Sequence, residues 1–61
     1  VKSDIISSIM NNILTLISLG KVAEAARYEV LLNRLIEEGE VWELNNLLDI
    51  TKKDLERYKD N

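Results

Sequence analysis

The sequence predicts an all-α fold, a small three-helix bundle formed by a single helical domain over residues 1–61. The chain contains no proline and two glycines, so its helices are almost uninterrupted. Gly20 and Gly39 divide it into segments of nearly equal length. In each segment the apolar residues recur at the three- and four-residue spacing of an amphipathic helix. We expect helices at about residues 4–19, 21–38 and 40–59.

The first helix is expected to contain IISSIMNNILTLISL, residues 5–19, which has no charged side chain. Its Ser, Asn and Thr residues fall in one arc of about 140°, and Ile, Leu and Met fill the opposite half. Ser3 is expected as the N-cap, with Asp4 well placed for the helix dipole. Gly20 followed by Lys21 indicates the C-terminal stop. The segment is therefore amphipathic although it is uncharged.

The second helix carries two apolar stripes. The main stripe consists of Val22, Ala25, Tyr28, Leu32, Leu35 and Ile36, and the smaller one of Ala23, Ala26 and Val30. Two stripes predict a central helix that contacts a neighbour on each side. Glu29 interrupts the main stripe, and we interpret it as a side chain at an edge or paired with an arginine rather than as a buried functional carboxylate.

The third helix has an unbroken stripe of residues that are apolar or that can be buried. The stripe consists of Val41, Leu44, Leu48, Thr51, Leu55 and Tyr58. Thr51 with Asp54 also fits a capping box, which would begin a separate short helix. Because the stripe keeps its phase across Thr51, we prefer one helix of about 30 Å. A chain that stayed helical through Gly20 would instead form a two-helix hairpin turning at Gly39, and two hairpins would pair into a four-helix bundle.

The uncharged segment, residues 5–19, is expected in the core and in a self-association surface rather than in a membrane. As a helix its fifteen residues span about 22 Å, less than the ~30 Å hydrocarbon core of a bilayer. A chain of 61 residues buries only about 60% of its unfolded surface. With no Cys for disulfides and no His for the usual zinc sites, association with another chain is the favoured source of stability. The predicted self-association residues are Ile6, Ile9, Met10, Ile13 and Ile17.

The composition offers little for catalysis. Without His or Cys, acid–base and nucleophilic chemistry would rest on carboxylates or lysine. Neither glycine belongs to a phosphate-binding cluster. We therefore expect no enzyme, cofactor, metal site or small-molecule substrate. An acidic run without an intervening basic residue consists of Glu37, Glu38, Glu40, Glu43 and Asp49. It lacks the Asp-rich loop of calcium sites, so we interpret it as a solvated face or a docking surface.

Trp42 and Ile50 point away from the apolar stripe of the third helix. A part-exposed tryptophan is typical of a binding hot spot, although Trp42 could instead cover the bundle end beside Gly39. The predicted partner-binding residues are Trp42, Ile50, Glu37, Glu38, Glu40 and Glu43. These features predict a protein–protein interaction module, a small adaptor or accessory subunit of a larger assembly. The absence of cysteine favours the cytoplasm.

The alternative function is a small dimeric DNA-binding regulator. GKVAEAARYEVLLNRLIEEGE is similar in spacing to the second-helix region of ribbon-helix-helix antitoxins. That resemblance implies DNA binding through an N-terminal strand, and only VKS precedes the first helix. The candidate nucleic-acid residues are Arg27, Arg34, Lys52, Lys53 and Arg57. The net charge of −3 opposes attraction to nucleic acid, so this function is not favoured.

A second resemblance concerns the junction of the first two helices. LGKVAEAARY resembles the turn and second-helix start of a tetratricopeptide repeat, with Gly20 and Ala25 at suitable places. The first helix has Leu, Asn and Ile where the repeat has aromatic residues and glycine. One such unit does not form an array.

Overall fold

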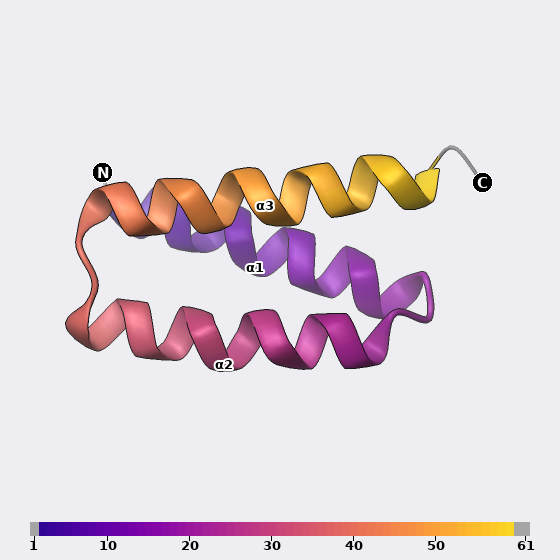
Figure 1. The fold of residues 1–61 in the computed structure, drawn as a ribbon, viewed down its shortest axis with the longest axis horizontal. Helices are drawn as coiled ribbons and strands as arrows, with labels where there is room; N and C mark the ends of the chain where they lie inside the picture. Colours follow the sequence, from indigo (N-terminus) through magenta and orange to yellow (C-terminus); the bar gives the residue numbers. More distant parts are fainter. Residues whose placement is uncertain (1, 60–61) are drawn as a thin grey trace.

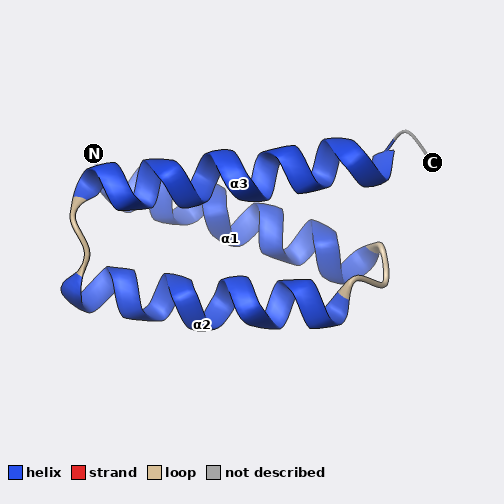
Figure 2. Cartoon of the chain, viewed as in Figure 1, coloured by secondary structure: helices blue, strands red, loops and turns tan. Residues whose placement is uncertain are grey.

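The computed structural model describes residues 2–59, which form three α-helices and no strand. The helices are α1 (Lys2–Ser18), α2 (Val22–Glu38) and α3 (Val41–Lys59). They form an elongated bundle with Cα extents of 34 × 17 × 14 Å. α1 and α3 run in the same direction and α2 runs opposite to both (Figure 1), with the two connections at opposite ends (Figure 2). The predicted three-helix bundle is confirmed, and the two-helix hairpin is excluded because α1 ends before Gly20.

The start of α1 differs from the prediction. Lys2 and Ser3 are already helical, so Ser3 is not the N-cap, and Val1 lies outside the described residues. Asp4 lies in the first turn of α1, where a carboxylate interacts favourably with the positive end of the helix dipole.

α1 ends at Gly20 in a Schellman motif. The Lys21 N–H donates to the Leu16 carbonyl at 2.9 Å, and the Gly20 N–H donates to the Ile17 carbonyl at 2.9 Å. Gly20 has φ of +82°, a left-handed conformation that residues with a Cβ rarely adopt. Gly20 therefore stops the helix because only its backbone closes this motif without strain.

Gly39 ends α2 for a different reason. Its backbone is extended, with φ of −87° and ψ of 163°, so the conformation is open to other residues. A Cβ at this position would lie 2.8 Å from both the Leu35 carbonyl oxygen and the Leu35 Cδ2 atom. α3 then begins with half of a capping box, in which the Glu43 Oε1 atom accepts the Glu40 N–H at 2.9 Å. The α2–α3 turn thus needs a small residue followed by an acidic helix start.

The core forms around α1. Its buried apolar side chains are Ile9, Ile13, Leu16, Ala25, Leu32, Leu35, Leu44, Leu47 and Leu55. α1 packs extensively against both α2 and α3, which contact one another less. The second helix contacts a neighbour on each side, as predicted, but α1 rather than α2 is the central helix. Ala23, Ala26 and Val30, the smaller stripe of α2, are exposed.

Two predicted self-association residues belong to this core. Ile9 and Ile13 are buried in the single chain, because one face of α1 must fill the space between α2 and α3. The core also includes Leu47, which the predicted stripe of the third helix omits. Leu47 lies three residues after Leu44, so the buried face of α3 is wider than one residue per turn.

Thr51 connects α3 to α1 within the core. Its side chain is fully buried, and its hydroxyl accepts a hydrogen bond from Asn12 Nδ2 at 3.0 Å and donates to the Leu48 carbonyl at 3.0 Å. α3 continues through this position, so the alternative in which Thr51 caps a separate helix is excluded. The hydrogen bond from Asn12 fixes the register of α1 against α3.

Two tyrosines connect α2 to α3 in a reciprocal arrangement. Tyr28 of α2 donates a hydrogen bond to the carboxylate of Asp54 on α3. Tyr58 of α3 donates to Glu24 Oε2 on α2 at 2.8 Å. The Lys21 ammonium group lies 4.6 Å from the centre of the Tyr58 ring. We call Glu24, Tyr28, Asp54 and Tyr58 the tyrosine clasp.

The clasp shifts the pKa values of both tyrosines and of Glu24. Burial, together with the hydrogen bond to Asp54, raises the pKa of Tyr28 to about 12. The hydrogen bond to Glu24 raises the pKa of Tyr58, and the same bond lowers the pKa of Glu24. The clasp is therefore favoured when the tyrosines are protonated and Glu24 is ionised.

Gly20→Ala should destabilise the fold by about 1–2 kcal/mol, because alanine must adopt a left-handed backbone conformation. Gly20→Asn should cost less, since asparagine tolerates that conformation better. Urea unfolding followed by circular dichroism, at one fixed protein concentration, measures both. Equal stability of the wild type and the alanine variant would contradict the role given to Gly20.

The tyrosine clasp should make stability fall at high pH. A tyrosine with a raised folded pKa contributes stability that is complete below its unfolded pKa, about 10, and is lost as pH rises through its folded pKa. Tyr58→Phe leaves Tyr28 as the one tyrosine of the chain, and its absorbance should titrate with a midpoint of about 12. Tyr28→Phe should reduce the loss of stability that the wild type shows between the unfolded pKa of tyrosine, about 10, and the folded pKa of Tyr28, about 12. An absorbance midpoint near 10 in the Tyr58→Phe variant would refute the clasp.

Candidate protein-binding surface

An apolar groove runs between α1 and α2 on the side of α1 away from α3. It has a volume of about 190 Å³. We call it the α1–α2 groove, and its lining residues are Met10, Ile13, Leu14, Ile17, Glu29, Leu32, Asn33 and Ile36. Ile13 and Leu32 are buried members of the core. The groove is therefore an extension of the core to the surface.

The exposed wall of this groove comes from α1. Met10, Leu14 and Ile17 follow the spacing i, i+4, i+7, which places them on one face of the helix; we call them the α1 strip. Leu14 is 61% exposed. The apolar half of α1 is wider than the face that α2 and α3 cover, so the strip remains outside the core.

The polar face of α1, which lies beside the α1 strip, carries no charge within residues 5–19. The Thr15 hydroxyl donates to the Asn11 carbonyl at 2.9 Å, and the Ser18 hydroxyl donates to the Thr15 carbonyl at 2.8 Å. These donors are already used by the helix, so a second apolar surface could approach without leaving them unpaired. Glu29 is exposed at the α2 side of the groove, in agreement with its interpretation as an edge residue.

The predicted self-association residues are thus divided. Met10 and Ile17 lie in the α1 strip, and Ile6 is partly buried against the core. Ile9 and Ile13 supply the core beneath them. Leu14 is not among the residues predicted from the sequence, although its spacing from Met10 and Ile17 was the signal that could have identified it.

Trp42 and Ile50 are both exposed on α3, and Trp42 is 64% exposed. The indole nitrogen of Trp42 donates to Glu40 Oε2 at 2.9 Å, which satisfies its polar edge and leaves the ring accessible. Trp42 therefore does not cover the core. Glu43 is occupied as the helix cap described above, which is a structural role that the sequence prediction did not assign to it.

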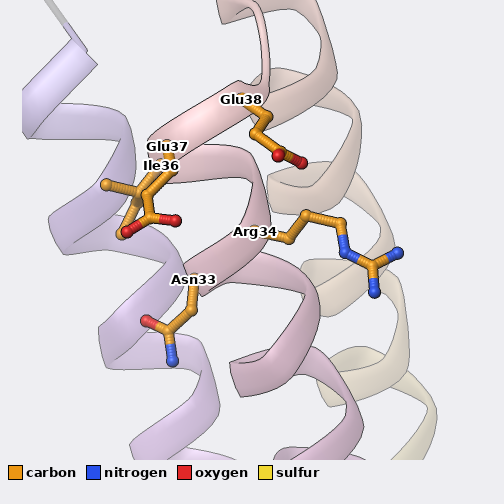
Figure 3. Close-up of a pocket in the computed structure, with 5 residues that line it drawn as sticks. All are labelled: Asn33, Arg34, Ile36, Glu37 and Glu38. Atoms are coloured by element: carbon orange, nitrogen blue, oxygen red, sulfur yellow. The ribbon is translucent and has the colours of Figure 1, made fainter.

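The remaining acidic residues lie on an open surface at the end of α2. Asn33, Arg34, Ile36, Glu37 and Glu38 line a shallow depression there. Their side chains diverge, with Ile36 and Glu37 on the α1 side and Arg34 on the α3 side (Figure 3). Within residues 2–59 no group of three acidic side chains is arranged to hold a metal ion. The same part of the chain contains no helix long and apolar enough to cross a bilayer.

The candidate nucleic-acid residues do not gather on one face. Lys52 lines a shallow pocket with residues of α1. Arg57 instead lies 3.5 Å from Asp54, the residue that Tyr28 of α2 contacts. Lys53 is exposed elsewhere on α3, while Arg27 and Arg34 are exposed on α2. The described residues also contain no strand of the kind that ribbon-helix-helix proteins insert into DNA.

Trp42→Ala should change the free energy of unfolding by no more than about 0.5 kcal/mol, because the side chain is exposed. Leu44→Ala is the matched control on the same helix and should cost about 2–5 kcal/mol, since Leu44 is fully buried. Thermal and urea unfolding measured by circular dichroism compare the two. A collapse of helicity in Trp42→Ala would instead assign Trp42 to the core.

In comparisons with protein-family models, with curated proteins and with solved structures, no match to the chain was found.

Proposed function

We propose that the chain is a non-enzymatic protein–protein interaction module, a small adaptor or accessory subunit that associates with another protein chain through the α1–α2 groove. The observation that carries this proposal is the exposure of Met10, Leu14 and Ile17 directly beside the core. Contiguous apolar surface of this kind on a small domain is typical of an interaction site. The absence of cysteine is in keeping with a cytoplasmic assembly.

The groove by itself supports binding of modest strength. Covering the exposed parts of Met10, Leu14, Ile17 and Ile36 would contribute about 1 kcal/mol each. A similar contribution from the partner brings the gain to about 8 kcal/mol, against an association cost of at least about 4 kcal/mol. The groove alone therefore supports reversible association, and tight binding requires a second contact.

Trp42 and Ile50 are the proposed second contact for a partner protein. A satisfied indole edge with an exposed ring face is suited to packing in a partner's pocket. Glu37, Glu38 and Glu40 are exposed near the same end of the bundle, where they would favour a partner of positive charge. Trp42, Ile50 and Glu40 lie on α3 and the turn before it, outside the lining of the α1–α2 groove.

A DNA-binding regulator remains the competing function. Retention on DNA at low salt that disappears at high salt and in the double variant Arg27→Ala, Arg34→Ala would favour it. An absence of retention at low salt would exclude it.

Leu14→Lys should abolish association through the groove, since a charge would be buried against an apolar surface. Val30→Lys is the matched control, because Val30 is 63% exposed and lies outside the groove. We expect sedimentation measurements and affinity capture from the native cells to show an assembly that Leu14→Lys loses and Val30→Lys retains. If neither self-association nor capture that depends on Leu14 is observed, the proposal is overturned.

A further inference from the structure

We propose that the occupant of the α1–α2 groove is a second copy of this chain, docked so that the two α1 helices run antiparallel about a two-fold axis near Leu14. This inference rests on the proposed function and identifies the partner of the same surface. In the dimer, Met10 of each copy packs beside Ile17 of the other, and the two Leu14 side chains meet close to the axis.

The absence of charge from residues 5–19 favours a second copy. In a two-fold contact each residue near the axis meets its own counterpart, so any charge there meets a like charge. Residues 5–19 carry no charge, in a chain in which 31% of the residues are charged. Selection of a different protein commonly uses complementary charges, which this face does not offer. Glu29 is the charged residue that lines the groove, and it lies on α2, where it is exposed.

The charges that bound this segment favour the antiparallel direction. Lys2 and Asp4 precede it and Lys21 follows it. Parallel helices would bring the two Lys21 ammonium groups together, whereas antiparallel helices place each Lys21 near the Asp4 of the other copy. The midpoint between Asp4 and Lys21 is one residue from the midpoint between Met10 and Ile17, about 1.5 Å along the helix. The Lys21 ammonium also lies 4.6 Å from the Tyr58 ring. Because that ring belongs to α3, the attraction between Lys21 and Asp4 of the other copy is a long-range one rather than a direct ion pair, and salt screens it.

The size and the hydrogen bonding of this face are compatible with such a contact. A standard interface buries about 800 Å² per partner, less than a fifth of the 4321 Å² surface of the chain. One long side of a bundle with extents of 34 × 17 Å is of that order. The Ser18 hydroxyl, beside the α1 strip, donates to the Thr15 carbonyl within α1, so covering it leaves no unpaired donor at that position.

Sedimentation equilibrium across a range reaching high micromolar concentration tests the dimer. We expect the mean mass to rise with concentration toward twice the 7.0 kDa of one chain. Leu14→Lys should remain a monomer, and Val30→Lys should associate like the wild type. Circular dichroism of both variants establishes that the bundle is folded.

Cysteine cross-linking tests the direction, and the chain has no native cysteine to give background. The variants Met10→Cys and Ile17→Cys are mixed and oxidised, then analysed by non-reducing electrophoresis with mass spectrometry. An antiparallel dimer gives the mixed disulfide in preference to either homodimer, and Leu14→Cys cross-links to itself. Val30→Cys, outside the contact, should cross-link slowly.

The outcomes separate this inference from the proposed function. If the chain is a monomer at every concentration, the inference that a second copy occupies the groove is wrong. Capture of another protein that depends on Leu14 would then still support the proposed function. If a dimer forms and Leu14→Lys does not disturb it, the dimer contact does not lie at the α1–α2 groove. A preference for the Met10→Cys and Ile17→Cys homodimers overturns the antiparallel arrangement.

Discussion

Packing of one face of α1 against both α2 and α3 is the interaction on which the rest of this fold depends. Ile9, Ile13 and Leu16 fill the space between the other two helices, which contact one another less than either contacts α1. A charged residue on this face would have to be desolvated in a very small core. The buried side of α1 must therefore be apolar. The turns, the bond from Asn12 to Thr51 and the tyrosine clasp fix how the other helices are placed around it.

The exposed surface of α1 needs a separate explanation, because a core requires only one side of a helix to be apolar. Met10, Leu14 and Ile17 extend the apolar half of α1 beyond the part that its neighbours cover. On the polar side, Thr15 and Ser18 bond to their own helix rather than to charged neighbours. A lysine or glutamate would serve equally well on a helix side that met only water. The two properties together are what self-association through this surface would require.

Much of the fold was accessible from the sequence, because two glycines and three periodic segments determine where helices begin and end. The arrangement of the helices was less accessible. Two stripes on α2 suggested a central position, yet Ala23, Ala26 and Val30 are exposed, since small residues contribute too little buried area to attract a neighbour. Periodicity also could not divide the apolar half of α1 between the buried Ile13 and the exposed Leu14, because that division depends on where α2 and α3 lie. The role of Glu43 as a cap depends similarly on the backbone of the turn.

Trp42 has a consequence for spectroscopy. It is the one tryptophan of the chain, and it lies at the start of α3 with its ring in water and its nitrogen bonded to Glu40. Because its ring is exposed, its emission in the folded chain should be close to that of a solvated indole, and core unfolding should change it little. Its fluorescence instead reports on the α2–α3 turn, and a blue shift would register the arrival of an apolar surface over the ring. The protein thus contains a built-in fluorescent probe at the second of its two candidate contacts, and this tryptophan lies outside the core.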